Sequence, residues 1–272
     1  MQPYRLWTTM VAREASRPRR KTRIKTFSDK FPWLGPTIWV LSVLYFIVQI
    51  VVASVWRPSY SWFSNTISDL GNTSCGPKLC SPRHDWMNGE FFVLGAVMAA
   101  GALLIYQEFT ERDPDERLAA RIGFSCLALA GAGAALVGQF PENTVGFMHV
   151  TGAGLAIGVG TLGIFVLGLV LALPNSLRWA VRVVAPLALV ALILFATHTY
   201  LGLGAGTTER LAAYPETIWL IIFGTYMART HRSRSHARAQ TMNRHEAPAH
   251  SESPGSVFCG HPLGTRCPVR RA

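Results

Sequence analysis

The sequence predicts an all-α fold: a polytopic membrane bundle of six transmembrane helices with both termini in the cytoplasm. Composition is the first observation behind this prediction, since 50% of the 272 residues are apolar and 15% are charged, whereas a soluble domain carries about 25% charged residues. The apolar residues also lie in long blocks, and Lys and Arg gather between the blocks and at the ends. This pattern argues against a water-soluble enzyme and against a disordered chain.

Six apolar blocks have about the length of a membrane span, because a helix rises about 1.5 Å per residue and the hydrocarbon layer is roughly 30 Å thick. The sixth block is short for a span unless the bilayer thins or a partner helix helps. The last block is the weakest, since Pro215 and Glu216 interrupt its start. Proline is tolerated in a first helical turn, so we expect this helix to begin near Tyr214. The six predicted spans are Pro36–Trp56, Phe91–Phe109, Ile122–Phe140, Val150–Leu173, Val183–Leu203 and Leu211–Ala228.

The distribution of basic residues predicts the topology. Of the 26 Lys and Arg residues, 22 lie before the first span, after the last span or in the two loops on that same side. Because cytoplasmic segments carry the excess of basic residues, we expect both termini in the cytoplasm and the spans in the cell (plasma) membrane. The predicted parts are a basic N-terminal segment (residues 1–35), a transmembrane domain (36–228) and a disordered basic tail (229–272).

The basic ends also bear on partners. Clusters of Lys and Arg beside a membrane attract anionic lipid, with about 1 kcal/mol for each residue near the surface. The formal charge of +11 would also suit a nucleic-acid binder, but charges at the ends of spans are more typical of topology signals. We therefore expect contacts with membrane lipids and none with nucleic acid, and the sequence leaves the oligomeric state open.

Small residues in the third and fourth spans predict close helix packing. Gly131 and Ala135 lie four residues apart in the third span, and Gly154 and Gly158 have the same spacing in the fourth. Small side chains at this spacing let two helix backbones approach closely in a bilayer. We interpret the glycines as packing residues rather than as hinges of a gate.

Polar residues gather in the segments expected on the outer side, which are residues 57–90, 141–149 and 204–210. Loops on one side of a bundle meet more readily than loops on opposite sides, so these residues can form one polar cluster. His198 is predicted to lie within the fifth span, where an ionisable group is costly and points to function. The candidate ligand-binding residues are Asn65, Ser68, Asp69, Glu142, His149, His198, Glu209 and Arg210.

Every candidate also has a structural explanation. Asp69 suits a helix cap or a turn, and His149 suits a cap of the fourth span. Glu209 and Arg210 can pin neighbouring loops, and a neutral His198 can be satisfied by one interhelical hydrogen bond. For any one residue alone, the structural explanation is favoured, so the hypothesis of a site depends on convergence.

Two cysteines of the first outer segment, Cys75 and Cys80, have the spacing C-x4-C. The outer side of a cell membrane is oxidising, which favours a disulfide between them. A metal site is the alternative, with His84 as the nearby additional ligand. We expect no metal site and no cofactor, since the sequence also contains no Walker or dinucleotide-binding loop.

Three motifs together carry a family resemblance: Asn65–Gly71 (NTISDLG), Phe140-Pro141-Glu142 followed by His149, and Gly206–Arg210 (GTTER). This pattern resembles the domain-of-unknown-function 998 family of prokaryotic multi-pass membrane proteins, over roughly residues 36 to 228. The resemblance implies a six-helix bundle in a prokaryotic cell membrane. It implies no settled activity, and it assigns no catalytic residue.

Three functions remain open at this point. The favoured one is a bundle that binds a lipid headgroup or another small ligand at an outward-facing polar site. The alternative is a membrane-embedded hydrolase, assisted by a metal ion or using Ser68 with His149 as its base. The third is a structural or accessory subunit. The absence of charged residues from the middle of the predicted spans argues against ion-coupled transport.

Overall fold

The computed structural model describes residues 30–110 and 112–246. Within these residues the regular structure is helical, apart from one isolated β-bridge between Arg57 and Cys80. The all-α prediction is therefore confirmed for the described part of the chain. Of the described residues, those up to Arg232 form one compact unit, which holds the helix bundle, and a second unit begins at Ser233.

Five helical segments within the described ranges are long and apolar enough to cross a membrane. They confirm that five of the predicted spans are long apolar helices, although their ends differ from the predicted ends. The first, second and fourth are each built from consecutive helices, and the fourth contains a π-helical turn. The segments are Leu34–Ser54 (α3 Leu34–Val40, α4 Val43–Ser54), His84–Phe109 (α5 His84–Tyr106, η2 Gln107–Phe109), Pro114–Gln139 (α6), Gly146–Val170 (α7 Gly146–Ala153, η3 Gly154–Val159, α8 Gly160–Val170) and Asn175–Ala196 (α9).

The predicted start of the last helix is wrong. Helix α10 covers Ala205–Glu246, so it begins well before Tyr214 and contains Pro215 in its interior. Contacts outside the helix hold its first turn, because the amide of Thr207 donates to the carbonyl of Phe63 at 3.2 Å. These contacts satisfy groups that a helix start otherwise leaves unpaired, and the apolar window alone does not register them.

Other helix ends also differ from the predicted spans. Helix α5 begins at His84 and α6 at Pro114, about two turns earlier than the apolar blocks do. Proline at the first position and the acidic residues Asp115 and Glu116 in the first turn favour the start of α6. Polar first turns thus belong to the helices although they fall outside the hydrophobic blocks.

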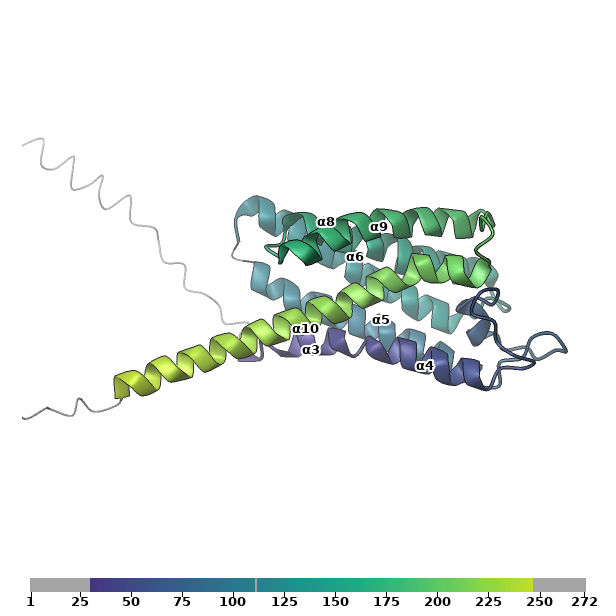
Figure 1. Cartoon of the computed structure of the whole chain (residues 1–272), viewed down its shortest axis with the longest axis horizontal. Coiled ribbons are helices and arrows are strands. Elements are labelled where there is room, and N and C mark those ends of the chain that lie inside the picture. Colours follow the sequence, from purple (N-terminus) through teal and green to yellow (C-terminus); the bar gives the residue numbers. More distant parts are fainter. Residues whose placement is uncertain (1–29, 111, 247–272) are drawn as a thin grey trace, which may run out of the picture. The chain divides into compact units, whose positions relative to one another are not determined.

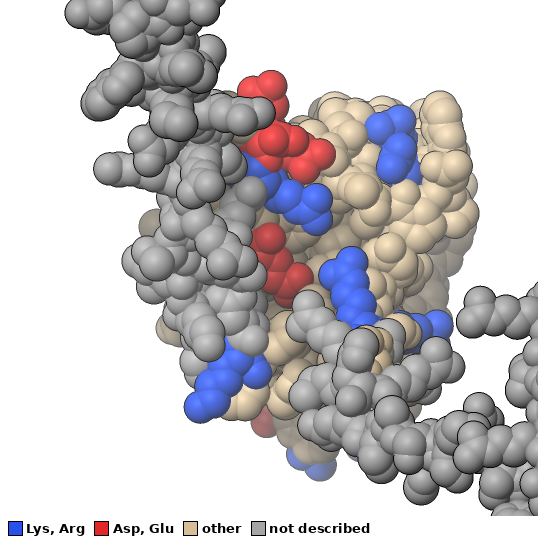
Figure 2. All heavy atoms as spheres, turned by 90° about the vertical axis from the view of Figure 1, so that its left-hand side faces the viewer, with Lys and Arg blue, Asp and Glu red and all other residues tan. Residues whose placement is uncertain are grey.

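The helices run between two ends of the bundle, which Figure 1 shows at its right and left. We call the first the loop end, which comprises residues 55–83, 140–145 and 197–204. We call the second the tail end, which comprises residues 107–110, 112–113 and 171–174. Figure 2 looks onto the tail end, where Lys and Arg side chains are spread together with Asp and Glu.

Close backbone contacts of the predicted kind join α5 and α6. A Cβ atom added at Gly95 would lie 2.3 Å from the carbonyl oxygen of Gly131, and one added at Gly131 would lie 2.4 Å from that of Gly95. Close packing at Gly131 is therefore confirmed. Around Gly154, where the π-helical turn begins, the space is open, so the predicted packing role of that glycine is wrong.

Candidate functional site

Three segments far apart in sequence meet at the hydroxyl group of Ser68, at the loop end of the bundle. Ser68 opens the short 3-10 helix η1 (Ser68–Gly71). Its Oγ lies 2.9 Å from Nε2 of His149 in α7 and 2.9 Å from Oε1 of Glu209 in α10. We call these three residues the Ser-His-Glu cluster. His149 and Glu209 are buried, and Ser68 is half-buried.

The hydrogen-bond partners limit where protons can sit in this cluster. Nδ1 of His149 lies 2.9 Å from the carbonyl oxygen of Phe140, and a carbonyl only accepts, so Nδ1 carries a hydrogen. The single hydrogen of the Ser68 hydroxyl then points either to Nε2 or to Glu209. Both contacts are satisfied by a neutral imidazole beside a carboxylic acid, or by an imidazolium beside a carboxylate.

Glu209 also fixes the start of η1. Its carboxyl group accepts hydrogen bonds from the backbone amides of Ile67 and of Ser68, the latter at 3.4 Å. These amides belong to the turn whose N–H groups have no partner inside the short helix. The side chain of Glu209 therefore ties α10 to η1, and it is 4% exposed.

Asp69 has a local structural role that its sequence position had suggested. Its Oδ2 accepts from the amide of Thr66 at 2.9 Å, and its own amide donates to Oγ1 of Thr66 at 2.9 Å. This is the reciprocal pattern of a capping box. The side chain of Asn65 adds a third contact, with Nδ2 donating to Oδ2 of Asp69 at 3.3 Å.

Glu142 faces Asp69 from the loop between α6 and α7. Burial raises the pKa of Glu142 to about 8, and the neighbouring Asp69 carboxylate acts in the same direction. Two carboxyl groups this close do not both ionise readily. The structure thus brings Asp69 and Glu142 together. The pair adjoins the Ser-His-Glu cluster, because Asp69 directly follows Ser68 in sequence.

Arg210 fastens residues 60–65 onto the start of α10. Its Nε donates to the hydroxyl of Tyr214 at 3.2 Å, and its Nη2 donates to the hydroxyl of Tyr60. Its guanidinium carbon lies 4.8 Å from the centre of the Trp62 ring. The acceptors of Nη1 are the carbonyl oxygens of Trp62 (3.0 Å), Asn65 (2.9 Å) and Gly206 (2.7 Å).

All of these partners of Arg210 are neutral. Among the residues that the structure describes, no carboxylate forms an ion pair with Arg210. Glu209 is its neighbour in sequence, but the carboxyl group of Glu209 is directed to η1. Arg210 therefore keeps a positive charge that no carboxylate contacts within this part of the chain.

The prediction that His198 lies within the fifth span is wrong. Helix α9 ends at Ala196, and His198 has a φ of 54° in the loop that follows. Its exposed ring contacts the hydroxyl of Tyr200 at 2.8 Å. The helix cannot continue past Thr197 because the backbone turns into the left-handed region at His198. The structure does not bring His198 to the Ser-His-Glu cluster.

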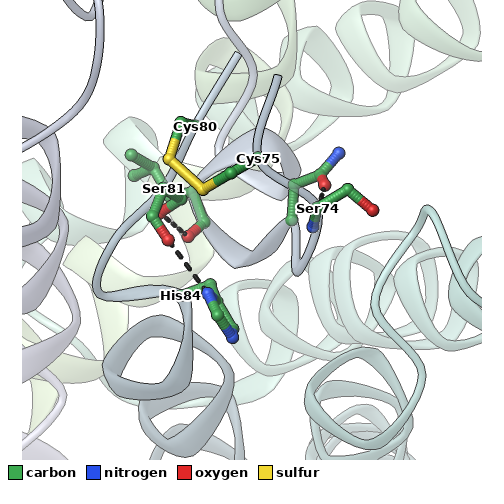
Figure 3. Close-up of a disulfide and its surroundings, with 7 residues drawn as sticks. Ser74, Cys75, Cys80, Ser81 and His84 are labelled. Atoms are coloured by element: carbon green, nitrogen blue, oxygen red, sulfur yellow. Dashed lines mark hydrogen bonds between the residues drawn. A yellow bond between two sulfur atoms is a disulfide. The ribbon is translucent and has the colours of Figure 1, made fainter.

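The cysteine pair left open by the sequence is bonded in the structure: Cys75 and Cys80 form a disulfide (Figure 3). Figure 3 also shows His84 turned toward Ser81, whose carbonyl oxygen lies 2.9 Å from Nδ1 of His84. The side-chain amide of Asn143 donates to the hydroxyl of Ser74 at 2.9 Å and so ties this loop to the α6–α7 loop. Within residues 30–110 and 112–246, no group of three or more His, Cys, Asp and Glu is arranged to hold a metal ion.

A large apolar groove runs beside Arg210, between α8, α9 and α10. Its volume is about 780 Å³. Ile164 from α8, Val184 from α9 and Ile218 from α10 line it, and Arg210 with Trp62 borders it at the loop end. Sequence reasoning missed this groove, because hydropathy shows that a residue is apolar but not whether its neighbours leave a space.

A second, smaller cavity of about 50 Å³ lies inside the bundle. Ser68, Glu209 and Glu216 contribute polar side chains to its wall. Glu216 is 4% exposed, and Glu90 in α5 is 6% exposed. The prediction that charged residues are missing from the middle of the predicted spans did not take account of these two buried carboxyl groups. It placed Glu216 at the interrupted start of the last span and Glu90 in a loop, whereas both helices begin earlier than expected.

Comparisons with known proteins place the chain in a family but add no activity. The family model described as "Protein of unknown function (DUF998)" matches residues 40–226. A search of curated proteins and a search of solved structures each gave no match. The match covers more than half of the chain and includes the Ser-His-Glu cluster, Arg210, four of the five apolar helical segments in full and most of the first. The chain therefore belongs to the DUF998 family and is a membrane protein whose biochemical activity the family does not define.

Proposed function

We propose that this protein is a plasma-membrane protein with six spans and cytoplasmic termini, and that it binds an anionic membrane lipid. The lipid headgroup contacts Arg210, and one acyl chain lies in the groove between α8, α9 and α10. The observation that carries the proposal is an apolar groove bordered by an arginine that no described carboxylate pairs with.

The apolar stretch of α10 supplies the sixth span. Residues 217–223 contain three large buried side chains, Trp219, Leu220 and Phe223, and Phe223 lies 5.7 Å from Trp39 of α3, ring centre to ring centre. The excess of Lys and Arg on the side of the termini supports a cytoplasmic tail end and an outward loop end. A disulfide at the loop end agrees with an oxidising outer side.

An introduced cysteine at each end tests this topology. A membrane-impermeant thiol reagent on intact cells is expected to label Ser59→Cys, an exposed position at the loop end. It is expected to label Ser176→Cys, an exposed position at the start of α9, only after the cells are permeabilised. Labelling of Ser176→Cys in intact cells would contradict the proposed orientation.

The chemistry of Arg210 suits a phosphate headgroup. Nε and one hydrogen of Nη2 are used by Tyr214 and Tyr60, and the two hydrogens of Nη1 are shared among three carbonyls. One hydrogen of Nη2 therefore remains for a ligand, as far as the described residues show. Arginine binds phosphate oxygens with charge-assisted hydrogen bonds. Trp62 beside it is an amphipathic aromatic side chain of the kind that lies at headgroup level.

Native mass spectrometry with two lipids tests the proposal. The purified full-length protein is exposed to an equimolar mixture of phosphatidylglycerol and phosphatidylcholine, and the retained lipid is identified by mass. We expect phosphatidylglycerol to be retained preferentially. Val184→Phe fills the groove, whereas Val183→Phe is the matched control, because Val183 is exposed but does not line the groove.

The outcomes separate clearly. The proposal expects Val184→Phe to lose retained phosphatidylglycerol and Val183→Phe to keep it. It expects Arg210→Lys to keep lipid in the groove but to lose much of the preference for the anionic headgroup, since a lysine lacks the planar fork of donors. Equal retention of both lipids by the wild-type protein would refute the proposal, as would equal retention by the two valine variants.

A membrane-embedded hydrolase is the second candidate, and the 2.9 Å contact between Ser68 Oγ and His149 Nε2 favours it. An oxyanion needs free backbone donors beside the nucleophile, but the amides of Ile67 and Ser68 already donate to Glu209. The adjoining cavity of about 50 Å³ is also small for a substrate. We therefore expect a fluorophosphonate probe to leave Ser68 unlabelled; labelling that Ser68→Ala abolishes would favour the hydrolase.

A further inference from the structure

Glu216 is a buried carboxyl group that the proposed lipid site does not use. Its side chain reaches toward α8 at Gly160, where the missing Cβ leaves room for the carboxyl group. Oε1 of Glu216 has no hydrogen-bond partner among the described residues. An ionised carboxylate without a partner is costly in a membrane interior, so this carboxyl group needs either a proton or a bound cation.

The small internal cavity joins Glu216 to Glu209. Both carboxyl side chains line it, together with Ser68, Tyr45 and Thr217. A cavity of about 50 Å³ with these polar groups in an otherwise apolar wall has room for a few water molecules, each of which needs roughly 10–15 Å³ and two or more polar partners. Water inside it can therefore bridge the two carboxyl groups.

The hydrogen-bonded chain continues from Glu209 to the loop end. Ser68 Oγ contacts Glu209 Oε1 at 2.9 Å and His149 Nε2 at 2.9 Å. Asp69 follows Ser68 in sequence and lies beside Glu142. Titratable side chains thus form a continuous series from the half-buried loop residues to the interior carboxyl group.

The series is closed toward the tail end. Beyond Glu216, the rings of Trp219 and Phe223 stack with centres 4.7 Å apart, and Trp39 packs against both. These three side chains are buried. Among the described residues, the polar groups near Glu216 therefore lead toward the loop end, while these rings separate it from the tail end.

We propose that Glu216 is a proton-binding group that exchanges with the loop end through Glu209, Ser68 and His149. The imidazolium of His149 gives its Nε2 proton to Ser68 Oγ while Ser68 gives its own hydroxyl proton to the Glu209 carboxylate. Cavity water then carries a proton from Glu209 to Glu216. The net change is one proton moved from imidazolium to carboxylate, with no electron transferred.

Few other titratable groups face Glu216. Tyr45 of α4 lines the same cavity. Tyr214 and Arg210 lie on the same helix as Glu216, about half a turn and nearly two turns before it. The side chains that α5, α6, α7 and η3 contribute to the cavity wall are apolar. Glu209 is thus the nearest carboxyl group with which Glu216 shares a polar space.

Infrared spectroscopy with hydrogen–deuterium exchange tests this proposal. The full-length protein in lipid nanodiscs is moved from H2O to D2O near neutral pH, and the shift of the protonated carboxyl C=O band is followed in time. Glu216→Gln identifies the band by its loss. We expect Ser68→Ala to keep this band and to slow its exchange on the order of tenfold or more.

Asp85→Asn is the matched control, because Asp85 is an exposed acidic residue at the same end of the bundle; its exchange rate is expected to equal that of the wild type. If Ser68→Ala fails to fold, His149→Gln takes its place with the same expected slowing. An exchange rate equal to that of the wild type in folded Ser68→Ala, or in folded His149→Gln, would overturn the proposal. The proposal would also be overturned if the spectrum of Glu216→Gln kept every protonated carboxyl band of the wild-type spectrum.

Discussion

Adding one methyl group at Gly160 tests the packing of Glu216 against α8. A Cβ atom at position 160 would lie 1.9 Å from Oε1 and 2.5 Å from Oε2 of Glu216, whereas real Cβ contacts essentially never fall below 3.0 Å. The buried carboxyl group must therefore move by about 1 Å, and overpacking of this kind costs about 1–3 kcal/mol. Replacing glycine by alanine within a helix otherwise gains about 0.5–1 kcal/mol.

Gly154 provides the matched control, since a Cβ added there meets nothing within 4 Å. We expect Gly160→Ala to lower the thermal unfolding temperature of the detergent-solubilised protein and Gly154→Ala to leave it unchanged or raise it. Combining Gly160→Ala with Glu216→Ala removes the clash, so the two changes should be non-additive by about 1 kcal/mol or more. Equal unfolding temperatures for the two alanine variants would refute the placement of Glu216.

Three further predictions concern the loop end. Burial raises the pKa of Glu142 to about 8, so its contribution to stability is complete below its unfolded pKa and is lost as pH rises through about 8. Glu142→Gln should therefore have a higher thermal unfolding temperature than the wild type near pH 9 and the same unfolding temperature near pH 5. Arg210→Lys should lower stability by about 1–3 kcal/mol in thermal unfolding, since it loses charge-assisted hydrogen bonds, while Arg57→Lys at an exposed site should not. Reductant should destabilise the wild type by about 2 kcal/mol through loss of the Cys75–Cys80 bond and leave Cys75→Ser with Cys80→Ser unaffected.

The contradicting outcomes differ for each of these. A difference between Glu142→Gln and wild type that is independent of pH would place Glu142 outside the carboxyl pair. Equal unfolding of Arg210→Lys and wild type would mean that the contacts to Tyr60 and Tyr214 contribute little. A wild-type protein that is insensitive to reductant would show that the disulfide adds no constraint.

The sequence predicted which regions form apolar helices, because about 20 apolar residues in a row are a strong and local signal. It did not predict where these helices end. The start of α10 depends on a backbone contact between Thr207 and Phe63, and the end of α9 depends on the turn at Thr197 and His198. Contacts of this kind are tertiary, so a hydropathy window does not contain them.

The candidate site was predictable as a region but not as a set of contacts. Sharing one side of a bundle was enough to expect that Ser68, His149 and Glu209 lie near one another, and the structure places them in contact. No sequence pattern indicated that the Glu209 carboxyl group accepts from the amides of η1 or that Arg210 donates to tyrosine hydroxyls. Whether these residues bind a ligand stays a prediction.

The burial of Glu216 was not predicted from the sequence. Next to Pro215, it looked like a residue at a frayed helix start, because proline and glutamate both lower the apolarity of that stretch. In the structure it is buried at a glycine of a neighbouring helix. The signal available in the sequence was an acidic residue within an otherwise apolar stretch. Such a residue in a membrane span points to function by default.

The measurement that tests the central claim most directly is the lipid retained by Val184→Phe and Val183→Phe in native mass spectrometry, from the same equimolar mixture of phosphatidylglycerol and phosphatidylcholine. The two substitutions add the same phenyl group at neighbouring exposed positions of α9, and only Val184 lines the groove. The groove proposal predicts that Val184→Phe alone loses phosphatidylglycerol. Equal retention by both variants would contradict it and leave Arg210 as a residue that only holds the loop to α10.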